Sequence, residues 1–299
     1  MPFLAPVAGA IAGGISAFGS FIGGLGIFGK ALVSIGLNLA VSALGRALSP
    51  KQKPISGVEL DVQFGESEDF ALYPRDLARD SALCERSGAD IVFAPTVEEM
   101  YPRPMETVVS VEPLGSDLIG AVRPGHFRGV ATVVTKLFNI VGPHRAYFGE
   151  KDFQQLTIIR RMVEDLASPV RIVGVATVRE EDGLAMSSRN IRLSPEDRLA
   201  ARVLSQALDL GAAMIESGEG DVGTIVSAMR ELIGREPRAD LASLDIRSVD
   251  GLGPIETIGQ ERVVMLITAR FGKVLLIDQR EAAGQALGQA RVDVRFHLV

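Results

Sequence analysis

Apolar side chains recur at two different spacings along most of this chain, and the alternation predicts its secondary structure. Between residues 126 and 141 they stand at 127, 130, 131, 134, 137, 138 and 141, close to the period of an α-helix, and Gly142-Pro143 should end that helix. By the same reasoning we expect further helices at 73–88, 153–166, 194–216 and 222–234, and strands at 90–94, 107–111, 145–149, 170–175, 243–249, 262–269 and 273–277. Strands that alternate with helices favour an α/β fold.

Several residues at the expected helix ends carry capping signals. Gly88 suits a C-terminal cap for the helix at 73–88. Asp152, with Gln155 three positions later, resembles a capping box for the helix at 153–166. Ser194 precedes Pro195, a combination typical of the first positions of a helix.

The beginning of the chain follows a different pattern. No charged residue precedes Lys30, and the next one is Arg46. Charge-free apolar runs of about 18 or more residues are long enough to cross a bilayer, and small-residue pairs such as Gly9 and Gly13 are typical of close-packed membrane helices. We interpret residues 2–48 as an apolar, glycine-rich helical segment that inserts into a membrane or packs on a partner protein. A polar linker, SPKQKP, follows at 49–54.

Composition narrows the chemistry of the rest. With 299 residues, 47% of them apolar, the chain can bury a core, and its length favours a division into two domains. A net charge of −6 argues against a nucleic-acid partner, which a basic stripe would attract. Cys84 is the sole cysteine, so an internal disulfide and a cysteine-based zinc site are excluded, and a reducing compartment fits.

Two polar clusters follow predicted strands. FGEKD, at 148–152, places a glycine, a lysine and two carboxylates between a strand and a helix, where α/β sheets bind ligands and helix N–H groups favour phosphate. AMSSRN, at 185–190, places two hydroxyls beside an arginine, which suits an oligophosphate. Each cluster alone could equally be a polar loop with a capping residue, but two such clusters at strand ends favour a nucleotide site.

These clusters belong to a longer series of motifs. In chain order they are YPR at 73–75, RPGHFRGV at 123–130, YFGEKDFQQL at 147–156, TVREEDGLAMSSRN at 177–190 and LSPEDR at 193–198. Over about residues 63–278 the chain resembles the pantothenate synthetase, or pantoate-β-alanine ligase, family. The resemblance implies a Rossmann-like nucleotidyltransferase sheet with a smaller α+β carboxy-terminal domain, and a cytoplasmic homodimer.

The resemblance also implies a reaction and its residues. ATP and pantoate would give pantoyl adenylate and pyrophosphate, with Mg²⁺ on the phosphates, and β-alanine would then attack the acyl carbon and release AMP. No residue is assigned as a metal ligand. By family position, charge on the pyrophosphate would be offset by Lys151, Ser187, Ser188 and Arg189. Those four would also bind ATP, together with Gly149, Glu150, Asp152, Val178 and Met186. Gln155 and Gln63 would hold pantoate, and Gln63 would also contact β-alanine.

The chain departs from the family pattern before Gln63. The family has P-T-M-G-A-L-H-x-G-H after its first strand, and those two histidines contact ATP phosphates and supply the expected proton donor. His126, His144 and His297 form no H-x-x-H pair here, and Leu60 stands where the family has an asparagine. We therefore expect a truncated sheet, lacking two central strands, and impaired activity.

These observations divide the chain into four parts. They are an apolar segment and linker at 1–56, a partial nucleotide-binding domain at 57–186, a carboxy-terminal lid domain at 187–280 and an irregular tail at 281–299. Residues 1–62 resemble the beginning of a phage tail protein, so a chimera joined near Gln63 is the simplest interpretation. Besides an impaired ligase, two alternatives stay open: a noncatalytic remnant that binds nucleotide or dimerises, and a membrane or phage-tail protein carrying the ligase part as a passenger.

The apolar segment gives a prediction of its own. Residues 1–56 fused to a soluble reporter should sediment with membranes and resist carbonate extraction, because two charge-free spans flank Lys30 and the basic residues Arg46, Lys51 and Lys53 would stay on the cytoplasmic side. Recovery of the fusion entirely in the soluble fraction would instead favour packing on a partner protein.

Overall fold

The structure, a computed structural model, describes residues 77–284, apart from the side chain of residue 79. It divides into two compact units, the first ending at Thr177 and the second beginning at Val178. The apolar segment at 2–48, the candidate ligand residue Gln63 and the tail from 285 lie outside the described residues. Among the helices of the described part, none is long and apolar enough to span a membrane.

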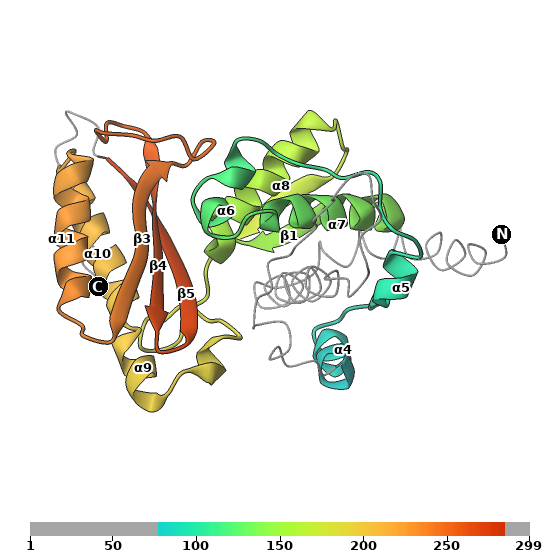
Figure 1. The fold of residues 1–299 in the computed structure, drawn as a ribbon, viewed down its shortest axis with the longest axis horizontal. Coiled ribbons are helices and arrows are strands. Elements are labelled where there is room, and N and C mark those ends of the chain that lie inside the picture. Colours follow the sequence, from blue (N-terminus) through green and yellow to red (C-terminus); the bar gives the residue numbers. More distant parts are fainter. Residues whose placement is uncertain (1–76, 285–299) are drawn as a thin grey trace, which may run out of the picture. The chain divides into compact units, whose positions relative to one another are not determined.

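The first unit is an α/β arrangement around two parallel strands (Figure 1). Strands β1 (Arg145–Gly149) and β2 (Arg171–Val175) pair in register from Arg145 and Arg171 to Gly149 and Val175. Helix α8 (Phe153–Asp165) connects them and packs on both strands and on α7 (His126–Val141). The shorter helices are α4 (Leu77–Arg86), α5 (Val97–Met100), α6 (Ile119–Val122) and the 3₁₀ turns η1 (Leu114–Ser116) and η2 (Glu150–Asp152).

Helix α7 confirms the sequence pattern that predicts it. Its apolar stripe is buried, with Val130, Val134 and Phe138 at most 8% exposed. Gly142 ends the helix in the left-handed conformation, with φ of 60°, and its N–H donates to the carbonyl of Phe138. Gly88 plays a similar part after α4, with φ of 83°.

The strands expected at 90–94 and 107–111 are not formed, and those predictions are wrong. At 107–111 the backbone is tied to a helix: Val109 donates its N–H to Thr132 Oγ1 at 3.0 Å, and that hydroxyl approaches the Val109 carbonyl at 3.3 Å. At 90–94 no other described strand pairs with the segment, and Ile91, Val92 and Phe93 are 41–50% exposed. A strand requires a hydrogen-bonded neighbour, which an apolar run alone does not provide.

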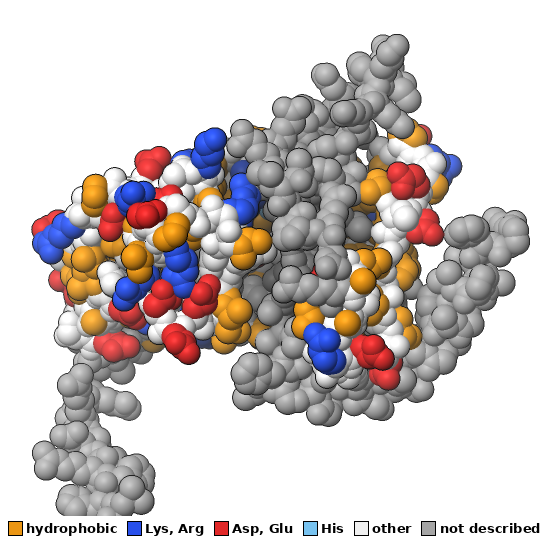
Figure 2. Space-filling model, turned by 90° about the horizontal axis from the view of Figure 1, so that it is seen from below, with side chains coloured by type: hydrophobic (Ala, Val, Ile, Leu, Met, Phe, Trp, Pro, Cys, Tyr) orange, Lys and Arg blue, Asp and Glu red, His pale blue; other side chains and the backbone are white. Residues whose placement is uncertain are grey.

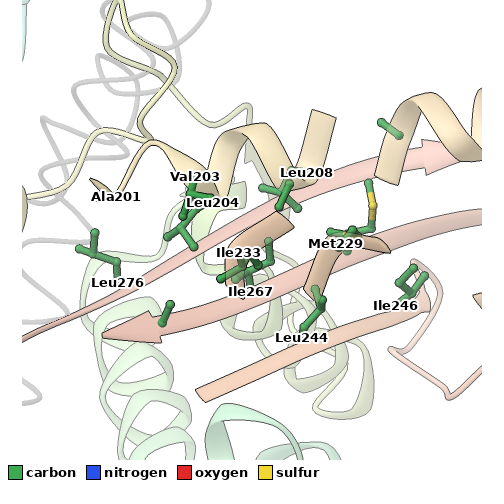
Figure 3. Close-up of a cluster of buried hydrophobic side chains, with 14 of the residues drawn as sticks. Ala201, Val203, Leu204, Leu208, Met229, Ile233, Leu244, Ile246, Ile267 and Leu276 are labelled. Carbon is green, nitrogen blue, oxygen red and sulfur yellow. The ribbon is translucent and has the colours of Figure 1, made fainter. Parts of the chain in front are cut away.

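The second unit is an α+β arrangement around an antiparallel sheet in the order β3-β4-β5 (Figure 1). The strands are β3 (Ala239–Ser248), β4 (Arg262–Phe271) and β5 (Val274–Ala283). Helices α10 (Val203–Glu216) and α11 (Val222–Gly234) pack on each other, α10 on β4 and β5, and α11 on β3. Their shared core contains Leu208, Met229 and Ile267, at most 1% exposed (Figure 3). The two units therefore have the fold class that the sequence predicts.

The single helix expected at 194–216 is divided in two. Ser194 caps α9 (Pro195–Ala200) by accepting from the N–H of Asp197 at 3.0 Å, as its sequence indicates. Residues 201–202 then form a turn, where the N–H of Leu204 donates to the carbonyl of Ala201, three positions back. This tighter bonding separates α9 from α10, a local change that the apolar period does not reveal.

Close packing in the second unit predicts the effect of one substitution. A Cβ on Gly211, inside α10, would lie 2.5 Å from the sulfur of Met265 and 2.7 Å from that of Met229. Gly211→Ala should therefore lower the free energy of unfolding by about 1–3 kcal/mol, despite the gain of about 0.5–1 kcal/mol in helix propensity. Gly234→Ala, at the end of α11, meets nothing within 4 Å and serves as the control. Urea unfolding of the full chain measures both, and equal stability of Gly211→Ala and wild type would contradict the packing argument.

Candidate functional site

The FGEKD cluster forms a polar turn held between two buried aromatic rings. Phe148, the fourth residue of β1, is 1% exposed, and Phe153, the first residue of α8, is 2% exposed. Between them, Gly149, Glu150, Lys151 and Asp152 are all half-buried, and the last three form η2. The structure thus brings four predicted site residues together at the junction of a strand and a helix N-terminus.

The capping box expected at Asp152 is not formed. Asp152 occupies the N-cap position of α8, but its side chain makes no capping hydrogen bond. The reason is local: the preceding residues already turn as a 3₁₀ helix, and the Asp152 backbone has φ of −92° and ψ of 61° rather than the extended conformation of a typical cap. Its carboxylate therefore accepts no hydrogen bond from the first backbone N–H groups of α8.

Glu150 is directed toward the neighbouring strand. A Cβ built on Gly174 of β2 would lie 2.7 Å from Glu150 Oε1 and 3.1 Å from an Arg160 guanidinium nitrogen. The absence of a side chain at Gly174 therefore leaves the room that the Glu150 carboxylate and the Arg160 guanidinium occupy.

The two glutamines of FQQL differ in their surroundings. Gln154 is buried and supports the loop before α7: its Nε2 donates to the carbonyls of Leu114 and Asp117, at 3.0 and 2.8 Å, and its Oε1 accepts from Ile119 N–H at 3.1 Å. Gln155, the predicted pantoate ligand, is half-buried beside it. The sequence does not reveal the structural role of Gln154, because two adjacent glutamines look alike until the structure shows which one is buried.

In the second unit, residues 178–186 form a hairpin. Arg179 and Ala185 make an antiparallel bridge, and Met186 N–H donates to the Val178 carbonyl at 2.9 Å. EEDG, residues 180–183, forms the turn of this hairpin: Gly183 has φ of 89°, and its N–H donates to the carbonyl of Glu180. Val178 and Met186 lie side by side at the open end and are 42% and 49% exposed. Two adjacent exposed apolar side chains are available to cover a flat ligand.

This hairpin also corrects the expected division of the chain. The sequence places the boundary after residue 186, whereas the second compact unit begins at Val178. The physical reason is that the hairpin's hydrogen bonds go to the second unit: Arg179 donates to Asp278 of β5 at 2.8 and 2.9 Å.

The serine turn, residues 187–190, follows the hairpin directly. Ser187 Oγ accepts from Arg189 N–H at 3.2 Å, and the Ser187 carbonyl accepts from Asn190 N–H at 3.0 Å. Ser188 is exposed, and Ser187 is half-buried. The Arg189 guanidinium donates to the Leu275 carbonyl of β5 at 3.0 Å, and this bond orients the side chain.

A charged network supports both the hairpin and the serine turn. Arg198 of α9 donates to Asp182 at 2.6 and 3.0 Å and to Glu180 at 2.7 Å. Asn190 Nδ2 bridges the two segments, donating to Glu180 at 2.8 Å and to the Ala185 carbonyl at 3.0 Å. Hydrogen bonds from Asn190 and then Arg198 lower the pKa of Glu180, and the bond from Arg198 lowers the pKa of Asp182. Sequence reasoning did not assign these residues a role, although all lie in the quoted motifs.

The predicted site residues thus form two groups. Gly149, Glu150, Lys151, Asp152 and Gln155 lie together in the first unit, and Val178, Met186, Ser187, Ser188 and Arg189 in the second. In the described part of the chain, no three His, Cys, Asp or Glu side chains are grouped so as to hold a metal ion. Side chains of both charge signs are interspersed on the described surface in Figure 2.

Comparison with known proteins shows that both groups lie within a match to one family. The sequence profile of pantoate-beta-alanine ligase matches residues 60–281. The chain belongs to this family. It is 55% identical to the pantothenate synthetase of Rhizobium meliloti over 231 residues, which are 77% of this chain and 79% of the relative. It is 56% identical to the pantothenate synthetase of Agrobacterium fabrum over 73% of this chain and 75% of the relative.

Solved structures of the family agree with the fold. The pantothenate synthetase from Thermus thermophilus matches with a TM-score of 0.69 and 50% identity, covering 74% of this chain and 79% of that one. A pantoate-beta-alanine ligase from Francisella tularensis, complexed with beta-gamma ATP and β-alanine, matches with a TM-score of 0.56 and 26% identity, covering 71% and 72%. The fold is therefore the nucleotidyltransferase-like α/β fold of pantothenate synthetases, and the family places this chain among the C–N ligases. The phage-tail resemblance of residues 1–62 stays a prediction.

The charged network predicts how acid affects the second unit. Unfolded Glu and Asp side chains have pKa values of about 4.3 and 3.9, and Glu180 and Asp182 have lower pKa values when folded. Their contribution to stability is thus fully present above about pH 5 and is lost as the pH falls through the folded-state values. Arg198→Met should destabilise the protein at neutral pH, and its difference from wild type should shrink toward about pH 3. Urea unfolding of both full-length proteins over this range measures the difference, which would stay constant if the network were irrelevant.

Proposed function

We propose that this chain condenses pantoate with β-alanine at the expense of ATP, through a pantoyl adenylate, at a rate reduced by the missing histidine motif. The observation that carries the proposal is the integrity of both phosphate-directed segments, GEKD and MSSR, in a chain that belongs to the ligase family. In the first step a pantoate carboxylate oxygen attacks the α-phosphorus of ATP and pyrophosphate leaves. In the second, the β-alanine amine attacks the acyl carbon, the new C–N bond forms and AMP leaves.

Positive charge and hydrogen-bond donors carry the first step. Negative charge accumulates on pyrophosphate as it departs, and donors already held in place stabilise it without reorganisation. Lys151 contributes an ammonium from the polar turn after β1. Ser187, Ser188 and Arg189 contribute two hydroxyls and a guanidinium from one turn, in which Arg189 is oriented by its bond to Leu275.

The remaining residues would bind the substrates. Gly149, Glu150 and Asp152 would line the nucleotide site, and the exposed pair Val178 and Met186 would cover the nucleotide. Gln155 would hold pantoate, as would Gln63, which would also contact β-alanine. The Francisella relative's complex with beta-gamma ATP and β-alanine supports this choice of ligands.

Mg²⁺ fits this proposal as an ion that phosphate oxygens would mainly coordinate. Mg²⁺ in nucleotide sites typically takes one or two protein carboxylates and keeps several waters, so no cluster of three acidic groups is required. Asp152, whose carboxylate does not cap α8, is the candidate for such a contact. When bound, the ion would neutralise phosphate charge.

A noncatalytic nucleotide-binding protein is the second candidate. It is favoured by one observation: the chain contains no H-x-x-H pair, whose histidines in the family contact ATP phosphates and supply the proton donor. Binding through Lys151 and the serine turn would survive this loss, whereas adenylation would not.

The proposed nucleotide site predicts unequal effects of two lysine substitutions. Lys151→Ala should weaken ATP binding by roughly tenfold or more, since a charge-assisted bond contributes about 1.5–3 kcal/mol. Lys136→Ala is the matched control in the same unit, because the Lys136 ammonium lies over the Tyr101 ring, 4.6 Å from its centroid. Calorimetric titration of both variants is sufficient, with melting temperatures to confirm folding. Equal losses would show that the site is not assembled.

The missing histidines predict slow turnover. Removing one positioned donor commonly costs about 10²- to 10³-fold in rate, and the family's histidine pair is absent from this sequence. AMP formation dependent on pantoate and β-alanine should therefore be at least about 10²-fold slower than in the Rhizobium meliloti relative assayed in parallel. Turnover within about tenfold of that enzyme would contradict the proposal of impairment.

A further inference from the structure

One buried ion pair joins the hairpin at 178–186 to the sheet of the second unit. The two terminal nitrogens of Arg179 donate to the two carboxylate oxygens of Asp278, at 2.8 and 2.9 Å. The Asp278 side chain is 1% exposed, and Arg179 is 21% exposed. Asp278 is itself held in place, because its Oδ1 accepts from the N–H of Gln279 at 2.7 Å. Two parallel bonds to a fixed carboxylate orient the guanidinium as well as attract it.

The same guanidinium also bonds to backbone on both sides. One nitrogen donates to the Gly183 carbonyl in the hairpin turn at 3.0 Å, and the other donates to the Gln279 carbonyl in β5 at 3.1 Å. Arg179 therefore closes the hairpin across its own turn and attaches it to β5. A lysine could not reproduce this arrangement, because an ammonium lacks the planar fork.

Arg198 of α9 also bonds to the hairpin, at Glu180 and Asp182 of its turn, whereas Arg179 bonds it to β5. The hairpin's own pairing consists of one isolated bridge, and the hairpin is not a member of the sheet β3-β4-β5. The serine turn begins where the hairpin ends, and its Arg189 bonds to Leu275 of the same strand β5. The donors of the serine turn are thus fixed relative to β5 through Arg179 at one end and Arg189 at the other.

We propose that Arg179, with Asp278, is a positioning residue for the serine turn, and that it sets the place of the Ser187, Ser188 and Arg189 donors for the phosphates of ATP. The proposal rests on the proposed function, since it takes the serine turn to be a phosphate site. Arg179 acts through the hairpin: its four donor contacts are used on Asp278, Gly183 and Gln279. Donors displaced by a fraction of an ångström lose much of their effect on a bound or reacting group.

The test compares Arg179→Lys with a matched control in the same unit. Arg179→Lys keeps the charge beside buried Asp278 and loses the fork. The control is Arg238→Lys. Arg238 forms an ion pair with Asp197 at 2.8 Å, and the Arg238 side chain is half-exposed. ATP affinity by calorimetry, amide hydrogen exchange over residues 178–190 and the melting temperature are measured on the full chain.

We expect Arg179→Lys to weaken ATP binding on the order of tenfold and to speed exchange of the Met186 amide, whose bond to Val178 closes the hairpin. Arg238→Lys should change neither. The double variant Arg179→Lys, Asp278→Glu lengthens the carboxylate to meet the shorter donor, and it should recover part of the affinity. A purely structural role would instead lower the melting temperature while leaving the affinity of the folded protein unchanged.

The outcomes separate this inference from the function on which it rests. If the wild type binds ATP and Arg179→Lys binds it equally well, the positioning role is wrong and the proposed function stands. If the wild type binds no ATP, the proposed function fails and the positioning role fails with it. If Arg179→Lys does not fold, the apolar pair Arg179→Met, Asp278→Leu takes its place, because it removes the attachment without leaving a buried charge unpaired. Unchanged affinity and exchange in that variant would also overturn the proposal.

Discussion

Burial of aromatic and aliphatic side chains next to each polar cluster is the constraint on which the candidate site depends. In the first unit, Phe148 and Phe153 are buried at the end of β1 and the start of α8. The four residues between them have to form a tight turn, so Lys151 and its neighbours remain near the surface. In the second unit, Leu184 and Ala185 are buried, and Met186, which follows directly, is exposed. Apolar burial therefore fixes where the chain changes direction, and the site residues stand at those places.

Electrostatics then determines how firmly the serine turn is held. A hairpin with one isolated bridge gains little from backbone pairing, and bonds between charged groups replace the missing ladder. Arg179 joins it to buried Asp278, and Arg198 joins its turn to α9 through Glu180 and Asp182. The first pair is shielded from solvent, while the carboxylates of the second are about one-third exposed and are screened by water. We therefore expect loss of the Arg179–Asp278 pair to disturb the hairpin more than loss of the Arg198 pairs.

Membership of the ligase family and departure from its motif coexist in this chain. The family profile begins at residue 60, and the match contains GEKD and MSSR but no H-x-x-H pair. In the proposed function these groups would supply different parts of the chemistry: Lys151 and the serine turn would bind phosphate charge, and the family's histidines would donate the proton. We therefore expect the chain to bind ATP but to form pantothenate slowly. An intact ligase would do both efficiently, and an unrelated protein would do neither.

Much of the fold and most of the site groups could be predicted from the sequence. Helices α7 and α11 and strand β1 have the predicted bounds, because apolar period, glycine and proline act locally and leave a direct mark on the sequence. The motifs likewise indicated which residues would share a turn.

The tertiary structure alone decided the rest. The segments at 90–94 and 107–111 have strand-like composition but form no strand, since pairing requires a neighbour and Thr132 takes the backbone of Val109. Asp152 does not cap α8, since η2 already turns the chain before it. The unit boundary falls at Val178, since Arg179 bonds to a residue 99 positions away, a separation that no local pattern records.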